Sequence, residues 1–440
     1  MFWLELAVVL SAMFLGARLG GIFLGMAGGV GLAVLTFVFH LAPSSPPIDV
    51  MLIITAVVVA ASTLQAAGGM DYLVHIAERI LRKNPRHITF VAPFVAYAFT
   101  FLSGTGNVSY SIMPVIAEVA RESGVRPERP MSISVIASQQ AITASPISAA
   151  TVTMVGLLSS FQISLLSLLS ICVPATLLGV FAGAFYSNRM GKELNEDPEY
   201  LRRVQSGLVP PVGERKAEAY VPRAGAKLAV ALFVLGAILV VSFGTFAELR
   251  PQILVSGKLI PMAMPHTIEI TMLVISAIIV LFCRVDVTQI VAGSVFKAGM
   301  MGIVCIFGLA WMGDTLVANN MDFIKNSVQA LVVSYPWVFA FALFFVATLT
   351  TSQAATTRAL MPLGISLGMS VPALIGVWPA VNGYFFIPNY ATLIAGVAFD
   401  RTGTTKIGKY VLNHSYMIPG LIATFVSVST ALFLGSLILK

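Results

Sequence analysis

Apolar residues run in long blocks along this chain, and short polar connections separate the blocks. A helix needs about 20 apolar residues to cross the hydrocarbon core of a bilayer, and blocks approaching this length recur from one end of the chain to the other. The alternation of apolar and polar positions that marks strands does not recur. The pattern predicts an all-α polytopic membrane protein with apolar segments at 3–17, 20–41, 49–67, 88–102, 131–158, 164–186, 228–246, 268–284, 297–318, 337–350, 371–398 and 411–438.

Composition supports the membrane assignment. Of the 440 residues, 58% are hydrophobic and 10% are charged, whereas a soluble domain carries about 25% charged residues. The net charge is +7, but the basic residues lie between apolar blocks, so we interpret them as topology signals and expect no nucleic-acid partner. The three cysteines lie within apolar blocks and the five histidines are scattered, so we expect no metal site and no cofactor. The opening MFWLEL has no basic stretch and indicates a retained helix.

One long charged stretch, residues 188–227, divides the chain. It contains eight Lys or Arg residues, six acidic residues and several prolines. This composition is typical of a linker without a core of its own. We therefore expect an N-terminal membrane repeat at 1–187, a cytoplasmic linker at 188–227 and a C-terminal membrane repeat at 228–440.

The distribution of Lys and Arg predicts the orientation in the membrane. Basic residues collect at 79–86, 121–129, 188–227 and 401–409, whereas the loops at 247–267 and 319–336 carry few. Placing the basic clusters inside a bacterial inner membrane puts both termini on the periplasmic side. This orientation requires residues 88–120 to form a re-entrant hairpin that enters and leaves on one face.

An internal repeat agrees with the hairpin. TLQAAGGMD at 63–71 resembles TLVANNMD at 315–322, and a proline follows the methionine fifteen residues later in both copies. Each copy then has an apolar arm, a polar cluster ending in Met-Pro, and a second break at 142–150 or 385–392. Chance similarity between apolar segments is the alternative. Five crossings plus a hairpin in each half require the two repeats to be inverted, which is typical of secondary transporters.

Polar clusters at the hairpin tips and at the second breaks form the candidate site. Glycines loosen the first tip, and Pro146 and Pro388 each leave preceding carbonyls unpaired. Non-helical backbone at membrane depth persists only where protein or water satisfies it, and free N–H groups at helix starts suit a carboxylate. Serine and threonine that only cap turns are the alternative. The predicted substrate-binding residues are Ser103, Thr105, Asn107, Ser109, Thr143, Ser145, Ser148, Ser352, Gln353, Thr356, Thr357, Arg358, Asn389, Tyr390 and Thr392.

Arg358 has the strongest individual signal. A cation within the membrane costs at least about 2.5–3.5 kcal/mol on insertion scales and usually marks a functional site, and a guanidinium matches a carboxylate bidentately. The alternatives are an arginine that extends to the interface or one that pairs with a structural acid. Asp314 lies near a predicted span end, where we expect an interfacial position. Gln139 and Gln140 precede the first break, and periodicity does not decide which of them faces the site.

These motifs resemble the anaerobic C4-dicarboxylate transporter family of the Dcu type over nearly the whole chain. The matching stretches are SGTGNVSYSIMPVIAEVARESGVRPERPMS, SQQAITASPISAA, TSQAATTRALMP and FDRTGTTKIGKYVLNHSYMIPG. The resemblance implies an inner-membrane antiporter that exchanges C4-dicarboxylates such as fumarate, malate, aspartate and succinate. It also implies kinship with the ion-transporter superfamily, in which a transport domain moves against a scaffold.

Other functions remain open at this point. The tips are rich in hydroxyls and carbonyls, which would also suit sodium in a cation-coupled dicarboxylate symporter. A membrane-embedded enzyme would need a nucleophile with its base, a metal cluster or paired acids, and the spans contain no such set. A partner of a membrane sensor kinase would use the linker 188–227 as its surface. Whether the protein is a monomer or a homodimer is also left open.

Overall fold

The structure is a computed structural model that describes residues 1–19, 22–106, 109–161, 163–209, 221–255, 258–388, 390–410 and 412–439. The helices of the first half are α1 (Phe2–Leu19), α2 (Phe23–Phe37), α3 (Ile48–Ala66), α4 (Gly69–Lys83), α5 (Ile88–Ser103), α6 (Ser109–Glu122), α7 (Glu128–Gln140), α8 (Ala149–Leu158), α9 (Leu165–Ser187) and α10 (Pro198–Gln205). The second half contains α11 (Ala226–Thr245), β1 (Gln252–Val255), β2 (Lys258–Pro261), α12 (Met264–Cys283), α13 (Val287–Ala292), α14 (Ser294–Asn319), α15 (Met321–Ser334), α16 (Pro336–Thr350), α17 (Gln353–Ser366), α18 (Val371–Val377), α19 (Ala391–Phe399) and α20 (Met417–Ile438).

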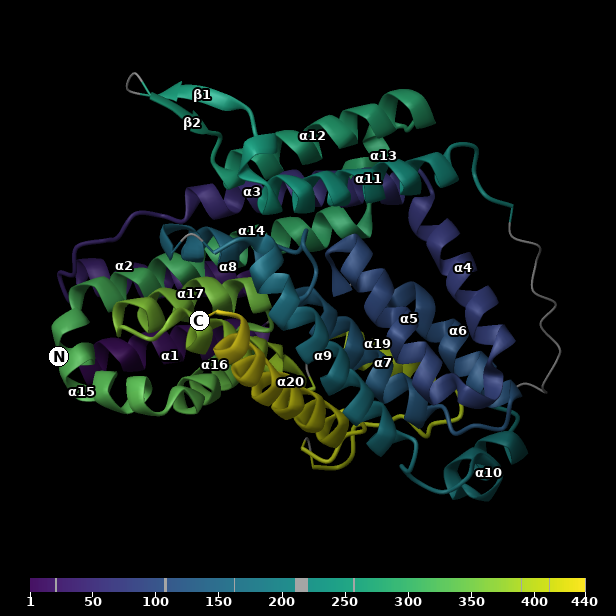
Figure 1. Ribbon diagram of the computed structural model, residues 1–440. Helices are drawn as coiled ribbons and strands as arrows, with labels where there is room; N and C mark the ends of the chain where they lie inside the picture. The colour runs from purple at the N-terminus through teal and green to yellow at the C-terminus, as the bar shows by residue number, and fades with distance from the viewer. Residues whose placement is uncertain are drawn as a thin grey trace.

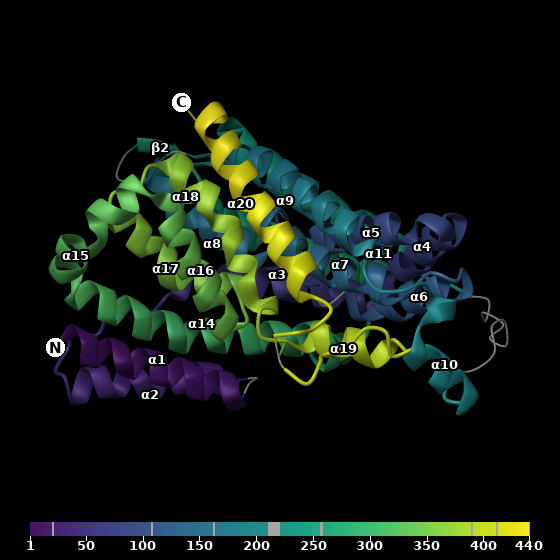
Figure 2. The ribbon, with the colours of Figure 1, turned by 90° about the horizontal axis from the view of Figure 1, so that it is seen from below.

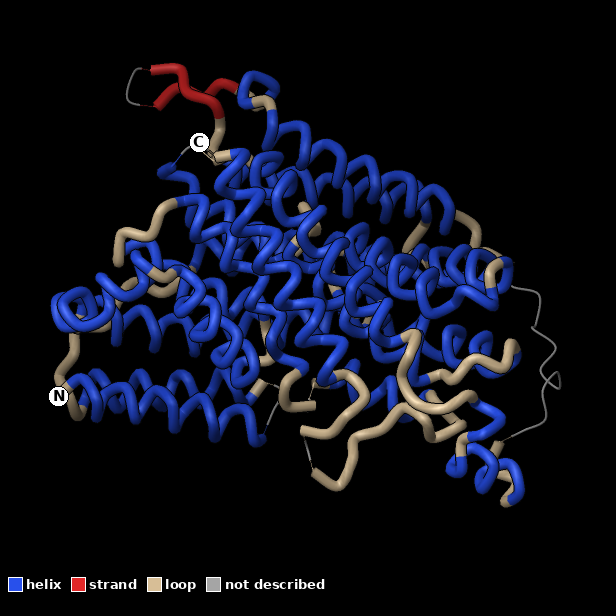
Figure 3. Tube along the Cα trace, turned by 60° about the horizontal axis from the view of Figure 1, so that its bottom comes forward, coloured by secondary structure: helices blue, strands red, loops and turns tan. Residues whose placement is uncertain are grey.

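The predicted all-α polytopic class is confirmed. In the described part of the chain, five helices are long and apolar enough to cross a membrane, namely α9, α11, α12, α14 and α20. The apolar part of α3 and helix α4 meet at 70° and would add a sixth span if counted together. Gly68, with a φ of +78°, lies at this bend. Shorter apolar helices, among them α2, α8 and α16, accompany these spans. The predicted loop at 247–267 contains the antiparallel pair β1 and β2 (Figure 3).

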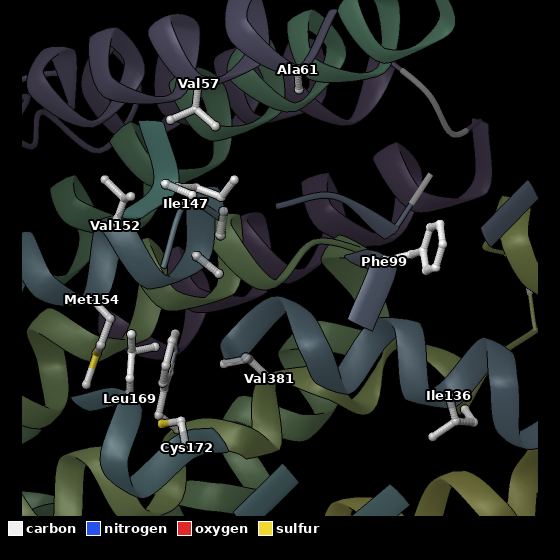
Figure 4. Packing of buried hydrophobic residues seen from close by; sticks show 14 of the residues in the cluster. Val57, Ala61, Phe99, Ile136, Ile147, Val152, Met154, Leu169, Cys172 and Val381 are labelled. Atoms are coloured by element: carbon white, nitrogen blue, oxygen red, sulfur yellow. The ribbon is translucent and has the colours of Figure 1, made fainter. Parts of the chain in front are cut away.

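The helices pack against one another along several long interfaces. Helices α3, α11 and α12 lie side by side along one edge, and α14 lies against α3 and α2 (Figure 1). Helices α9 and α20 run together across the middle, and α4, α5 and α6 form the end far from the N-terminus (Figure 2). Figure 4 shows the apolar interior, where Val57 and Ala61 of α3 face the segment that carries Ile147, and Met154 and Cys172 lie farther from α3 in this view.

Glycines allow a close approach between helices α2 and α14. A Cβ at Gly308 would overlap the backbone of Gly25, and a Cβ at Gly25 would overlap the backbone of Val304. Small residues let helix backbones approach in this way in membranes, where packing rather than the hydrophobic effect drives association. The contact fixes α14, which forms one wall of the site described next.

Two predicted spans are not continuous helices. The span 131–158 becomes α7, a 3-10 turn at Ala141–Thr143 and α8, with Pro146 in the interruption. The span 371–398 becomes α18, a 3-10 helix at Trp378–Phe385 and α19, with Pro388 in the interruption. The predicted span 411–438 begins late, because α20 starts only at Met417, after a turn in which Ile407 and His414 form an isolated bridge. The relation of the two halves by inversion stays a prediction.

Candidate functional site

Two helical hairpins carry the first part of the site. Helix α5 ends at Ser103, and Gly104 reverses the chain with a φ of +69°. The amide of Gly104 donates to the carbonyl of Thr100 at 2.8 Å, and Ser103 Oγ donates to the carbonyl of Thr105 at 3.1 Å. A Cβ at residue 104 would meet the carbonyl oxygen of Ile147 at 2.9 Å. Glycine is therefore required both by the left-handed conformation and by the neighbouring backbone.

The second tip has the same construction with different residues. Thr351 takes the left-handed position with a φ of +50° and donates its amide to Ala347 at 2.9 Å. Thr350 Oγ1 donates to the carbonyl of Ser352 at 3.3 Å, as Ser103 does at the first tip. Ser352 then caps α17 by accepting the amide of Ala355 at 3.2 Å. A β-branched residue in this conformation stores strain that glycine avoids, and such strain gathers at functional sites.

The interrupted helix between α7 and α8 packs against the first tip. Ser145 Oγ donates to the carbonyl of Phe101 in α5 at 2.7 Å. Ser148 Oγ donates to the carbonyl of Ile142 at 2.5 Å and accepts the amide of Thr151 at 3.1 Å. Ser148 thus satisfies backbone groups at the interruption, and Ser145 satisfies a carbonyl near the end of α5. The interruption is thus held in one geometry, with the start of α8 beside the tip.

A buried amide network joins the second tip to both interrupted helices. Gln353 Nε2 donates to the carbonyl of Gln139 at 2.8 Å and to Asn382 Oδ1 at 2.7 Å. Asn382 Nδ2 in turn donates to Gln140 Oε1 at 3.0 Å and to Thr143 Oγ1 at 3.3 Å. Gln140 Nε2 completes the network by donating to Thr424 of α20 at 3.2 Å. A fully paired network of this kind holds its members rigidly in a low-dielectric interior.

A cavity of about 490 Å³ lies between the tips and the wall formed by α3 and α14. This volume lies within the ordinary range for small-molecule sites, about 300–1,000 Å³. The wall is largely apolar, whereas the tip side offers hydroxyls, phenols and backbone groups. The tip side is formed by Ser103, Gly104, Thr105, Gly106, Tyr110, Ile142, Ala149, Ala150, Thr350, Thr351, Ser352, Gln353, Ala354 and Tyr390.

Arg358 lies outside the residues that line this cavity. Its Nη2 is 3.0 Å from Asp314 Oδ2 of α14, and the two side chains are 19% and 15% exposed. Asp314 is therefore largely enclosed by protein and paired, rather than free at an interface. Pairing with an acid, one alternative that the sequence left open for Arg358, is the arrangement found here. The Nε of Arg358 has no partner among the described residues.

The predicted residues differ in how they relate to the cavity. Those that line the cavity are Ser103, Thr105, Ser352, Gln353 and Tyr390. Those that support it through bonds to neighbouring groups are Ser109, Thr143, Ser145, Ser148, Thr356 and Thr357. Thr392 is buried, and no described group bonds its hydroxyl. Asn107 and Asn389 lie outside the described residues. Sequence reasoning did not select Tyr110, Thr350, Thr351 or Asn382 as substrate-binding residues. An amide within the apolar segment 371–398, which Asn382 shares with the predicted Asn389, was the available signal for Asn382.

Basic loops meet at the base of the first hairpin. Arg82 Nη1 lies 2.8 Å from Glu122, and Arg129 Nη2 lies 3.0 Å from Glu193 of the linker. Arg126 bonds both Glu128 and Asp197 of the linker. Burial alone would raise the pKa of Asp197, but backbone amides of α10 and the Arg126 guanidinium hold that pKa below its ordinary value. The basic cluster at 121–129 therefore contacts two others that the sequence placed on the same side of the membrane, 79–86 and 188–227.

Comparison with known proteins identifies relatives over the full length. Residues 1–439 match the family described as "Anaerobic c4-dicarboxylate membrane transporter". The "C4-dicarboxylate transporter DcuA" of Escherichia coli K12 is 45% identical over 436 residues, 99% of each chain, and that of Wolinella succinogenes is 44% identical over 435 residues, also 99% of each. The "Anaerobic C4-dicarboxylate transporter DcuB" of Escherichia coli O6:H1 is 40% identical over 443 residues, 97% of each chain.

Two solved transporter structures share the fold. The YdaH transporter of Alcanivorax borkumensis has a TM-score of 0.55 at 13% identity, covering 94% of this chain and 98% of that one. MtrF of Neisseria gonorrhoeae, described among antimetabolite efflux pumps, has a TM-score of 0.53 at 12% identity, covering 92% of this chain and 84% of that one. At such low identity the likeness concerns the fold alone.

Proposed function

This chain belongs to the family of anaerobic C4-dicarboxylate membrane transporters, and from that premise we propose that it is an inner-membrane antiporter. It exchanges C4-dicarboxylates such as fumarate, malate, aspartate and succinate by alternating access. An equally charged dicarboxylate returns on each cycle, so exchange requires no proton carrier. The observation that carries the proposal is the cavity of about 490 Å³ into which both hairpin tips project.

The cavity is suited to an anion because two helices begin at it. Gln353 and Ala354 open α17, and Ala149 and Ala150 open α8, and all four residues line the cavity. Unpaired N–H groups at a helix start carry partial positive charge and bind carboxylates. Two such helix starts from different halves of the chain would accommodate one carboxylate each. This division suits a ligand that is charged at both ends.

Hydroxyl donors from the tip side would complete the binding of the two carboxylates. The phenols of Tyr110 and Tyr390 line the cavity, and so do Thr105 and Thr351. Arg358 lies one helical turn after Ala354 in α17 and contributes positive charge from behind the second tip. We expect the ligand to compete with Asp314 for this guanidinium, because a carboxylate is the preferred partner of its planar fork.

Alternating access would move the tips relative to the wall formed by α3 and α14. The first hairpin is re-entrant in this proposal, with both termini of the protein periplasmic. Its two arms end together, since Ser123 Oγ donates to the carbonyl of Pro85 at 3.4 Å and Arg82 pairs with Glu122. Those ends lie among the basic loops, which belong on the cytoplasmic side by the distribution of positive charge.

Counterflow in proteoliposomes tests this function. Vesicles loaded with unlabelled succinate should accumulate labelled succinate, and external fumarate, malate or aspartate should compete. Uptake should require dicarboxylate inside and should be the same in sodium and in choline medium. Uptake into empty vesicles driven by a sodium gradient would favour the cation-coupled symporter, and an absence of competition by all C4 acids would contradict dicarboxylate transport.

A further inference from the structure

Gln139 carries a side-chain amide that is buried in the protein interior. Its side chain is 1% exposed, and neither Nε2 nor Oε1 has a partner among the described residues. The adjacent Gln140 contrasts with it, because its Nε2 donates to Thr424 and its Oε1 accepts from Asn382 and Ser427. An unpaired buried polar group is destabilising, so one kept in the interior calls for a partner that is absent from the empty protein.

Gln139 lies one helical turn from the cavity. Ile142, three residues later, lines the cavity, and positions three apart share a face of a helix. The carbonyl of Gln139 accepts the amide of Gln353, which also lines the cavity. The residue is therefore one hydrogen bond removed from the cavity lining, beneath its floor. Its neighbour Gln140 is fully engaged in the amide network, so the two glutamines have separate roles.

We propose, on the basis of the dicarboxylate transport proposed above, that the Gln139 amide, buried in this conformation, becomes accessible when the tip that carries Gln353 moves. The amide then binds the substrate and senses its second carbon. Nε2 donates to a carboxylate oxygen, and Oε1 accepts from a donor on the adjacent carbon. Malate presents a hydroxyl there and aspartate an ammonium group, whereas succinate and fumarate present no donor. An amide supplies a donor and an acceptor on two separate atoms of one side chain, whereas a hydroxyl has one oxygen for both and an ionised carboxylate only accepts. Gln139 thus favours 2-substituted C4-dicarboxylates.

The variant Gln139→Met tests the assignment, because methionine keeps the shape and removes both polar atoms. An amide that is unpaired in the empty protein should be dispensable for stability, so the melting temperature in detergent should stay the same or rise. The half-saturating concentrations of malate and aspartate in counterflow should rise roughly tenfold or more, as expected for a lost hydrogen bond to a charged or strongly polar ligand. The half-saturating concentration of succinate should rise clearly less.

Thr153→Val on α8 serves as a control, since among the described residues Thr153 Oγ1 bonds a carbonyl of its own helix, that of Ala149, at 2.7 Å. This variant should leave the half-saturating concentration of every substrate unchanged. Equal effects of Gln139→Met on succinate and aspartate, unchanged concentrations for all substrates, or a markedly lower melting temperature would each overturn the assignment. Counterflow by the unaltered protein distinguishes failure of the proposed function from failure of this inference. If it shows no dicarboxylate counterflow, the proposed function fails, whereas normal counterflow with an indifferent Gln139→Met leaves that function intact.

Discussion

Replacing Asn382 with alanine removes the centre of the buried amide network. Asn382 accepts from Gln353 at 2.7 Å and donates to Gln140 at 3.0 Å and to Thr143 at 3.3 Å. It is 1% exposed, so water does not replace these bonds without a rearrangement. The change therefore loosens the second tip from the interrupted helix of the first half.

The size of the effect follows from what each partner retains. The amide of Gln353 still donates to a backbone carbonyl of α7, and Gln140 Oε1 still accepts from Ser427 at 3.2 Å. Thr143 Oγ1 still donates to the carbonyl of Gln140 at 2.9 Å. No group becomes wholly unpaired, so the cost is three net hydrogen bonds of about 0.5–1.5 kcal/mol each, or roughly 1.5–4.5 kcal/mol in total.

Thermal unfolding in detergent and succinate counterflow measure the two consequences of Asn382→Ala. We expect a lower melting temperature and a higher half-saturating concentration, since Gln353 no longer holds a fixed position at the cavity. Asn319→Ala is the matched control, because its amide bonds two backbone carbonyls at 2.8 Å at an exposed position and should change transport little. An Asn382→Ala protein that melts and transports like the unaltered one would refute the network as the support of the tip.

Three further predictions concern charge and packing. Asp314→Asn should lower the free energy of unfolding by about 3–5 kcal/mol by leaving Arg358 unpaired, whereas the double variant D314L/R358L should melt close to the unaltered protein. Full succinate exchange by that double variant would show that the arginine does not bind the ligand. Gly25→Ala should lower the free energy of unfolding by about 1–3 kcal/mol by overlapping the backbone of α14. Gly29→Ala on the same helix faces open space and should be neutral or slightly stabilising, so equal melting temperatures of the two variants would contradict the packing. The pKa of Asp197 is held below its ordinary value, so the stabilising contribution of this carboxylate is present at pH above that ordinary value and is lost as pH falls through the lowered pKa. The melting temperature should therefore fall more steeply with acid in the unaltered protein than in Asp197→Asn, and parallel curves would argue against this role.

The sequence predicted the helices and their interruptions because these features depend on local chemistry. Apolar blocks reveal the spans, and the left-handed Gly104 and the prolines at 146 and 388 mark where helices reverse or break. Such signals act within a few residues, so reading the chain in order is enough to find them. The turn at Thr351 is the exception, since a β-branched residue in the left-handed region is not what a local pattern predicts.

The partners within the site are set by tertiary structure instead. Asn382 is separated by 242 residues from Gln140 and by 29 from Gln353. Asp314 and Arg358 come from helices α14 and α17, whose crossing brings them to 3.0 Å. No periodicity relates such positions, and for that reason the sequence left open which glutamine faces the site and whether Arg358 has an acidic partner.

The interrupted helix α7–α8 is the element that couples the two tips. Ser145 in its break holds the first hairpin through the carbonyl of Phe101, and the carbonyl of Gln139 holds the second through Gln353. The start of α8 also lines the cavity. A ligand that draws either tip inward must therefore act on the same short segment, because both tips are bonded to it. Coupling between the two halves of the chain requires no direct contact between the tips, and a substitution within the break should affect the binding of both carboxylates together.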